Sequence, residues 1–160
     1  MVGVEPVSAI TQSESLSWQR QEVSIYTSSW GPPDDGAVLS GPNDLIDAAI
    51  NSGVSEGRGG RGSLYFFANG NGAHNDDNCG ADGYINSPFI FSIQAADESG
   101  EVPFYGEICA AVGVTAFVGS ALSPTIEEGN ECSRRFAGTS AACPTVTGCV
   151  ALMLQARFVP

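Results

Sequence analysis

The sequence predicts an α/β fold in which helices flank a parallel β-sheet. Short apolar runs alternate with segments whose apolar residues recur at helical spacing, as in folds built on parallel strands. The 20 glycines and nine prolines indicate many loops and tight turns. A chain of 160 residues, 42% hydrophobic and 15% charged, suits one domain and excludes a disordered acidic tail.

Local patterns predict the individual elements. Apolar residues after Asn43 recur at helical spacing, and Gly53 follows them as glycine does at a helix C-terminus. The expected elements are, in order, a short polar helix over 7–16, a strand over 23–26, a helix over 42–53, a strand over 63–68, a long loop over 69–86, a strand over 89–95 and a helix over 138–155. The stretch 110–135 gives no clear prediction.

The charge balance excludes several kinds of partner. Eighteen acidic and six basic residues give a net charge of −12, which argues against nucleic acid and anionic membranes. Residues 1–5 lack the features of a signal peptide, and no uninterrupted apolar run is as long as a membrane span, so neither a targeting signal nor a membrane segment is expected. An apolar helix predicted over 150–158 meets the end of the sequence, so we expect a larger domain of which this chain is part.

Ser140 and Asn71 are the first candidates for chemistry. Ser140 follows a small-residue loop at the start of the last helix, where free N–H groups and the helix dipole favour a nucleophile whose reaction develops an oxyanion. Taken alone, the motif favours a plain helix cap, a role that serines often have. Asn71 lies between two glycines after a buried strand, and it can donate to an oxyanion or form an ordinary Asn-Gly turn.

Acidic residues are scattered through the glycine-rich loops. If they converge, they form a calcium site or a pocket for a cationic side chain; if they do not, they are solvated loop charges. These residues are Asp34, Asp35, Asp76, Asp77, Asp82 and Glu107.

Five short segments, in this order and at these intervals, resemble the proprotein convertases, the kexin and furin branch of the subtilisin-like serine proteases (peptidase family S8). The resemblance runs from about residue 7 to the end of the chain. It implies a subtilisin-like α/β fold. The segments are 28–36, 57–63, 68–72, 82–87 and 138–144.

The resemblance also implies roles for individual residues. Ser140 matches the catalytic nucleophile, and Asn71 matches the oxyanion-hole asparagine. Asp34 and Asp82, with the carbonyl groups of Pro32 and Ala68, match the pocket for the substrate arginine. The remaining substrate contacts implied are the strand edge Ser29, Trp30 and Gly31, and Tyr84 in the S4 subsite.

The resemblance implies a calcium ion held by Asp34, Asp77 and Glu107, and a disulfide between Cys79 and Cys109. It matches Cys132 to a cysteine whose partner lies upstream of this sequence. Cys143 and Cys149 are expected to be buried free thiols.

The catalytic Asp and His of the family precede segment 28–36. The only histidine here, His74, does not match the catalytic one and is expected to be a solvated loop residue. We therefore expect residues 1–160 to form part of a peptidase S8 catalytic domain without its Asp and His, inactive alone. In furin-like members, acidic residues at the positions of Gln12 and Ser40 recognise a substrate arginine at P4. The resemblance therefore implies a basic residue at P1 and does not extend to P4.

These observations predict a serine endopeptidase that cleaves proproteins or peptides after arginine or lysine, with calcium as its cofactor. The resemblance implies a secretory or extracellular location. The alternative is a non-catalytic remnant that binds calcium or basic peptides. It is motivated by Phe136 and Ala137, which replace a His-Thr pair of the family just before Gly138.

Overall fold

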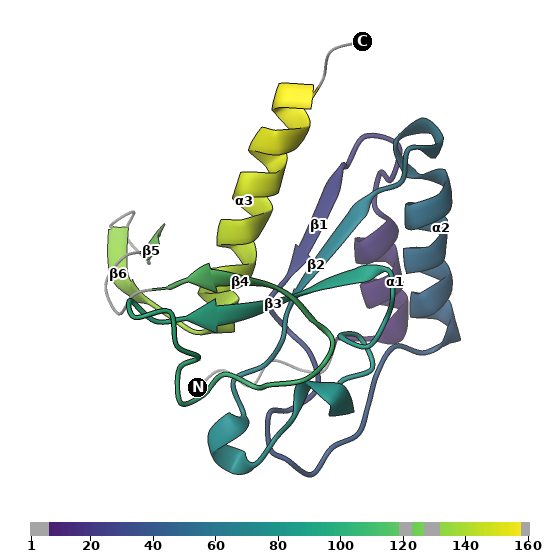
Figure 1. The fold of residues 1–160 in the computed structure, drawn as a ribbon. Coiled ribbons are helices and arrows are strands. Elements are labelled where there is room, and N and C mark those ends of the chain that lie inside the picture. Colours follow the sequence, from purple (N-terminus) through teal and green to yellow (C-terminus); the bar gives the residue numbers. More distant parts are fainter. Residues whose placement is uncertain (1–6, 119–122, 127–131, 158–160) are drawn as a thin grey trace. The chain divides into compact units, whose positions relative to one another are not determined.

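The computed structural model describes residues 7–118, 123–126 and 132–157, and it confirms the α/β fold (Figure 1). A four-stranded sheet has the order β1-β2-β3-β4, and β5 pairs with β6 in an antiparallel ribbon. The elements are α1 (Ala9–Ser17), β1 (Ile25–Ser28), α2 (Asp44–Gly60), β2 (Leu64–Ala68), η1 (Ala73–Asn75), η2 (Cys79–Ala81), β3 (Ile90–Ala96), β4 (Val112–Phe117), β5 (Ser123–Ile126), β6 (Cys132–Phe136) and α3 (Thr139–Arg157).

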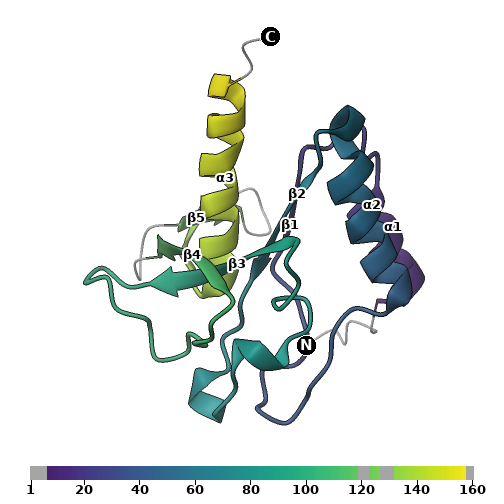
Figure 2. The ribbon, with the colours of Figure 1, turned by 45° about the vertical axis from the view of Figure 1, so that its right-hand side comes forward.

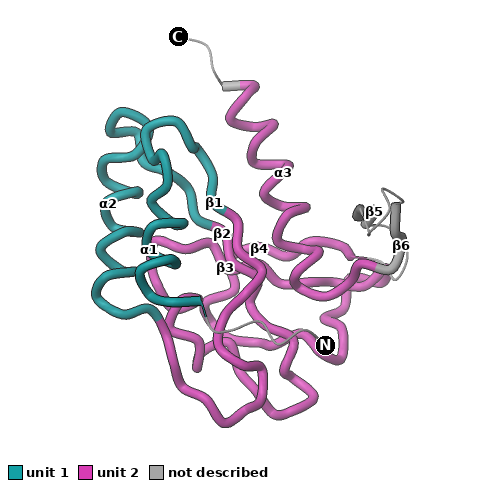
Figure 3. Tube along the Cα trace, turned by 180° about the vertical axis from the view of Figure 1, so that it is seen from behind, with its two compact units in different colours: residues 1–26, 42–65 teal, residues 27–41, 66–160 magenta. Residues whose placement is uncertain are grey.

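The chain divides into two compact units (Figure 3). Unit 1 comprises residues 1–26 and 42–65, and unit 2 comprises residues 27–41 and 66–160. Unit 1 therefore contains α1 and α2, whereas unit 2 contains β3, β4, α3 and the long loops.

In unit 1, α1 and α2 lie side by side (Figures 1 and 2). Each helix begins where a side chain accepts a hydrogen bond from a free N–H group: Ser8 accepts from Thr11 N, and Asn43 accepts from Ile46 N. Tyr65 anchors the pair of helices, because its hydroxyl donates to the Leu16 carbonyl at 2.7 Å. Burial raises the pKa of Tyr65 strongly, so this donor keeps its proton.

The prediction that Gly53 ends the second helix is wrong. The helix α2 continues beyond it, and non-helical backbone begins only at Gly57, inside segment 57–63. Gly53 is needed for packing, because a Cβ there would collide with the hydroxyl of Tyr65. A glycine that allows close packing looks the same in sequence as a glycine that ends a helix.

In unit 2, β3 and β4 pair in parallel, and α3 packs on both. The strand β4 was not predicted, because Gly113 and Thr115 interrupt its apolar pattern and most of its side chains are exposed at the edge of the sheet. The core includes Phe67, Ile93 and Ala95, which are fully buried.

The helix α3 differs from expectation in two ways. By length and composition alone, Thr139–Ala156 could cross a membrane, with a mean hydropathy of 1.2 over 18 residues, although no such segment was expected. A core helix passes the same test, and the first turn of α3 is buried at Ala142 and Cys143, so no membrane role follows from it. Cys143 is buried as predicted, but Cys149 is exposed, because six residues along a helix place it on another face.

Candidate active site

A cavity in unit 2, which we call the serine cavity, brings together residues from four separate segments of the chain. Most of the residues implied for catalysis and substrate binding line it. They are Ser29, Trp30, Gly31, Asp34, Ala68, Gly70, Asn71, Asp82, Thr139 and Ser140.

Ser140 is the second residue of α3, so it is not the helix cap. In the first turn of a helix the N–H groups lack intrahelical acceptors, and the N–H of Ser140 can therefore donate to a ligand. Pro144 cannot donate to the carbonyl of Ser140, because proline has no N–H. The hydroxyl of Ser29 donates to that carbonyl instead, at 3.2 Å, and thus ties the strand-end segment to the helix start.

Asn71 does not form a simple local turn, since its side chain binds a residue 68 positions away. Its Oδ1 accepts from the N–H of Thr139 at 2.9 Å and from the Thr139 hydroxyl at 3.1 Å. Because both bonds need the carbonyl end of the amide, they fix its orientation and leave the NH₂ end to donate. Gly138, with φ of +86°, allows this contact: a Cβ there would lie 3.0 Å from Asn71 Oδ1.

Asp34 and Asp82 supply negative charge to the serine cavity. Asp82 Oδ1 accepts from the N–H of Tyr84 at 2.7 Å, which holds the carboxyl in place. Burial, and secondarily the neighbouring Asp34, raise the pKa of Asp82. Two carboxyl groups in a partly buried pocket are suited to a guanidinium, which offsets part of their charge and donates in a bidentate geometry.

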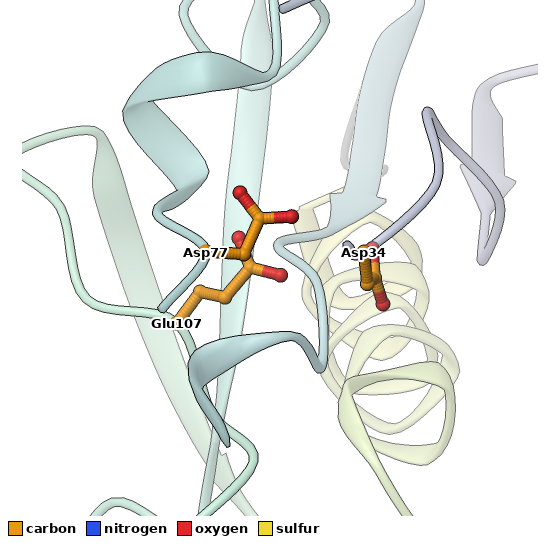
Figure 4. A group of neighbouring side chains, drawn as sticks. All are labelled: Asp34, Asp77 and Glu107. Atoms are coloured by element: carbon orange, nitrogen blue, oxygen red, sulfur yellow. The ribbon is translucent and has the colours of Figure 1, made fainter. Parts of the chain in front are cut away.

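A second cavity, the acid cavity, adjoins the first through Asp34 and Asp82, which line both. Asp34, Asp77 and Glu107 form what we call the acid group, with one oxygen of each within 4.8 Å of the others (Figure 4). Burial raises the pKa of Glu107 to about 7, and the charges of Asp34 and Asp77 contribute. The acid group therefore concentrates negative charge that a cation would offset.

The donor set of the acid cavity fits calcium, which prefers carboxylate and amide oxygens. Asn69 lines this cavity and is 1% exposed. Its NH₂ group donates to the Glu107 carbonyl at 2.7 Å, while its Oδ1 is buried with no hydrogen-bond partner among the described residues. Sequence reasoning missed both Asn69 and Thr139, because neither has a signature apart from its distant partners.

The other predicted residues lie close by. Pro32 lines the acid cavity rather than the serine cavity. Tyr84 packs edge-on against Trp30, with ring centroids 5.4 Å apart. His74 is exposed, as predicted, and its ring lies 6.1 Å from that of Phe104.

Cys79 and Cys109 form the implied disulfide. It joins positions two residues after Asp77 and two residues after Glu107. The side chain of Cys132 lies outside the described residues.

The model of the subtilase family, peptidase S8, matches residues 3–158. The chain belongs to the subtilase family. This is a family of serine endopeptidases, and the matched relatives are of the kexin and furin type, which confirms the resemblance. The dibasic-processing endoprotease of Schizosaccharomyces pombe is 45% identical over 95% of this chain. The mouse proprotein convertase subtilisin/kexin type 4 is 39% identical over 94% of it.

The chain spans only part of these subtilases, 22% of the yeast relative and 24% of the mouse one. Among solved structures, the prenylagaramide maturation protease PagA superposes with a TM-score of 0.69 at 18% identity, covering 98% of this chain and 54% of that one. The PatG macrocyclase, in complex with a peptide, gives 0.69 at 16% identity, covering 92% of this chain and 42% of that one. At these identities the likeness supports the subtilase fold alone.

Proposed function

We propose that the protein containing this chain is a kexin-type serine endopeptidase that cleaves proproteins or peptides after arginine or lysine. The observation that carries the proposal is the serine cavity itself. It combines a helix-start serine, an oriented amide and two carboxyl groups: Ser140, Asn71, Asp34 and Asp82.

In this proposal the Ser140 hydroxyl attacks the scissile carbonyl. The Asn71 NH₂ group and the Ser140 N–H then donate to the oxyanion that develops. The bonds from Thr139 to Asn71 Oδ1 support this assignment, because they preset the amide before substrate arrives. The attack also needs a general base. His74 is exposed, lies beside the ring of Phe104 and does not line the serine cavity, so it does not supply this base. We therefore propose that these 160 residues alone are inactive.

Asp34 and Asp82 would bind the P1 guanidinium, and the carbonyls of Pro32 and Ala68 would accept its remaining N–H groups. The segment Ser29 to Gly31 would pair with the substrate backbone as an added strand. Tyr84, packed on Trp30, would line the S4 subsite.

We further propose calcium as the cofactor, held by Asp34, Asp77 and Glu107. The unpartnered Oδ1 of Asn69 and the raised pKa of Glu107 support a cation in the acid cavity. When bound, the ion would supply positive charge that offsets the carboxylates and lowers the raised pKa of Glu107.

A secretory or extracellular location agrees with the Cys79–Cys109 disulfide, since such bonds persist in oxidising compartments. The substrate partner would be a basic peptide or proprotein.

Fluorophosphonate labelling tests the proposal on the complete product of the gene that encodes this chain. Stoichiometric labelling at Ser140, its loss in Ser140→Ala, and cleavage of a fluorogenic peptide with arginine at P1 are expected. If the folded protein is neither labelled nor active, yet binds calcium or basic peptides, it is instead a non-catalytic subtilase remnant.

A further inference from the structure

Two carboxylates of the acid group hold the backbone that carries Asn71. The N–H of Asn71 donates to Asp34 Oδ2 at 2.8 Å. The next N–H, that of Gly72, donates to Glu107 Oε1 at 2.9 Å. Consecutive N–H groups of one loop are therefore bound by two of the three residues that converge in the acid cavity.

This loop has little freedom to adjust. Gly70 has φ of +107°, and a Cβ there would collide with the Glu107 carboxylate. A Cβ on Gly72 would lie 2.8 Å from Asp77 Cβ and 2.9 Å from Asp34 Cβ. Because the loop is packed directly against the acid group, a shift of those side chains must move the loop.

The Asn71 side chain carries such a shift to the serine cavity. Its Oδ1 is bound by the N–H and hydroxyl of Thr139, the residue before Ser140. The connection thus runs from the acid group, through the Asn71 backbone, to the side-chain amide and the start of α3.

Mutual repulsion acts on the acid group whenever its carboxylates are charged without a cation, because their oxygens lie within 4.8 Å. Asp34 and Glu107 each have a second oxygen available for a cation while the first accepts from the loop. A cation would thus hold Asp34 and Glu107 where the loop needs them.

We propose that Asp34 and Glu107 are positioning residues for Asn71, and that cation binding to the acid group sets the geometry of the oxyanion donor. The inference rests on the calcium site proposed above. It adds to that site a control of the chemical step.

In the first test, the complete gene product is titrated with calcium. Calorimetry measures calcium binding, and residue-resolved hydrogen exchange measures the protection of each backbone amide. Saturating calcium should slow exchange of the Asn71 and Gly72 amides by 10-fold or more. The matched control is the pair of backbone amides of Ser99 and Glu101. Both donate to Asp97, whose carboxylate lies outside the acid group. Their exchange should not change.

Asp77→Asn removes charge from the acid group without touching either loop bond. It should raise the calcium concentration needed for amide protection by at least 10-fold, with full protection recovered at saturation. Asp76→Asn is the matched control, because Asp76 is the exposed neighbour outside the group.

In hydrolysis assays, calcium depletion should lower kcat for arginine substrates, not only raise KM.

The outcomes separate the two proposals. If calorimetry detects no calcium binding, the calcium site and this inference both fail. If calcium binds but the Asn71 and Gly72 amides stay unprotected, or only KM responds, the site stands and the coupling is refuted. Binding with selective protection and a kcat response supports both.

Discussion

The serine cavity and the acid cavity share two lining residues and differ in all the others. Asp34 and Asp82 line both. The serine cavity adds a hydroxyl and an oriented amide, whereas the acid cavity adds Asp77 and Glu107. The first set is suited to a reaction and the second to binding a cation. A substitution can therefore affect the reaction and cation binding separately only at a residue that lines one cavity and not the other.

The largest separable effect is expected at Asn71, which lines the serine cavity only. Asn71→Leu removes the amide donor at nearly constant volume and should lower kcat of the complete gene product by about 10²–10³-fold. Calcium affinity, measured by calorimetry, should stay within a factor of about three, because Asp34 keeps its carboxylate. A parallel loss of calcium binding would show that the cavities are not separable at this residue.

Asp82 is shared, so its substitution should affect recognition more than chemistry. Asp82→Asn leaves an arginine guanidinium without one carboxylate, a loss of roughly 2 kcal/mol or more, so kcat/KM should fall about 30-fold or more. A substrate with methionine at P1 is the control and should lose far less. Equal losses for both substrates would argue against Asp82 as an arginine-binding residue.

Glu107 lies on the other side of the comparison, in the acid cavity only. Glu107→Gln should weaken calcium binding roughly 10-fold or more, since ligand charge governs affinity. The serine cavity should still label with fluorophosphonate at saturating calcium. Labelling lost even at saturation would show that the serine cavity depends on the Glu107 carboxylate itself and not only on the cation that it binds.

The raised pKa of Glu107 also predicts a pH dependence in chelator. The folded state releases this proton near pH 7, and the unfolded state near the ordinary value of 4.5. Between these values the folded state binds more protons, so this residue makes stability fall as pH rises from about 5 to 8. Thermal unfolding in chelator should show the fall in the wild type and a flatter profile in Glu107→Gln. Identical profiles would contradict it.

The smallest effect is expected at Thr139. Thr139→Val removes one of two bonds to Asn71 Oδ1 and keeps the backbone one. A neutral hydrogen bond is worth about 0.5–1.5 kcal/mol, so kcat should fall about 2- to 12-fold with calcium binding unchanged. Thr139→Ser, which keeps the hydroxyl, should restore most of the rate; failure to do so would assign the loss to packing.

Sequence patterns predicted most of the fold, because buried strands such as β2 and β3 and the apolar α3 have strong local signals. They missed β4, an edge strand broken by Gly113, and they misplaced the end of α2, because the need for Gly53 arises from Tyr65 across the fold. The candidate site was gathered mainly by resemblance to a family. The roles of Thr139 and Asn69 depend on contacts between distant residues, which no local pattern contains.

The disulfide has a consequence for binding of the proposed cation. Each of its cysteines follows an acid-group residue by two positions, so the bond limits how far Asp77 and Glu107 can separate. Oxidation thus lowers the entropic cost of assembling the acid group, and by linkage a bound cation makes the bond harder to reduce. Reduction of the disulfide and removal of the proposed cation would therefore each favour the other.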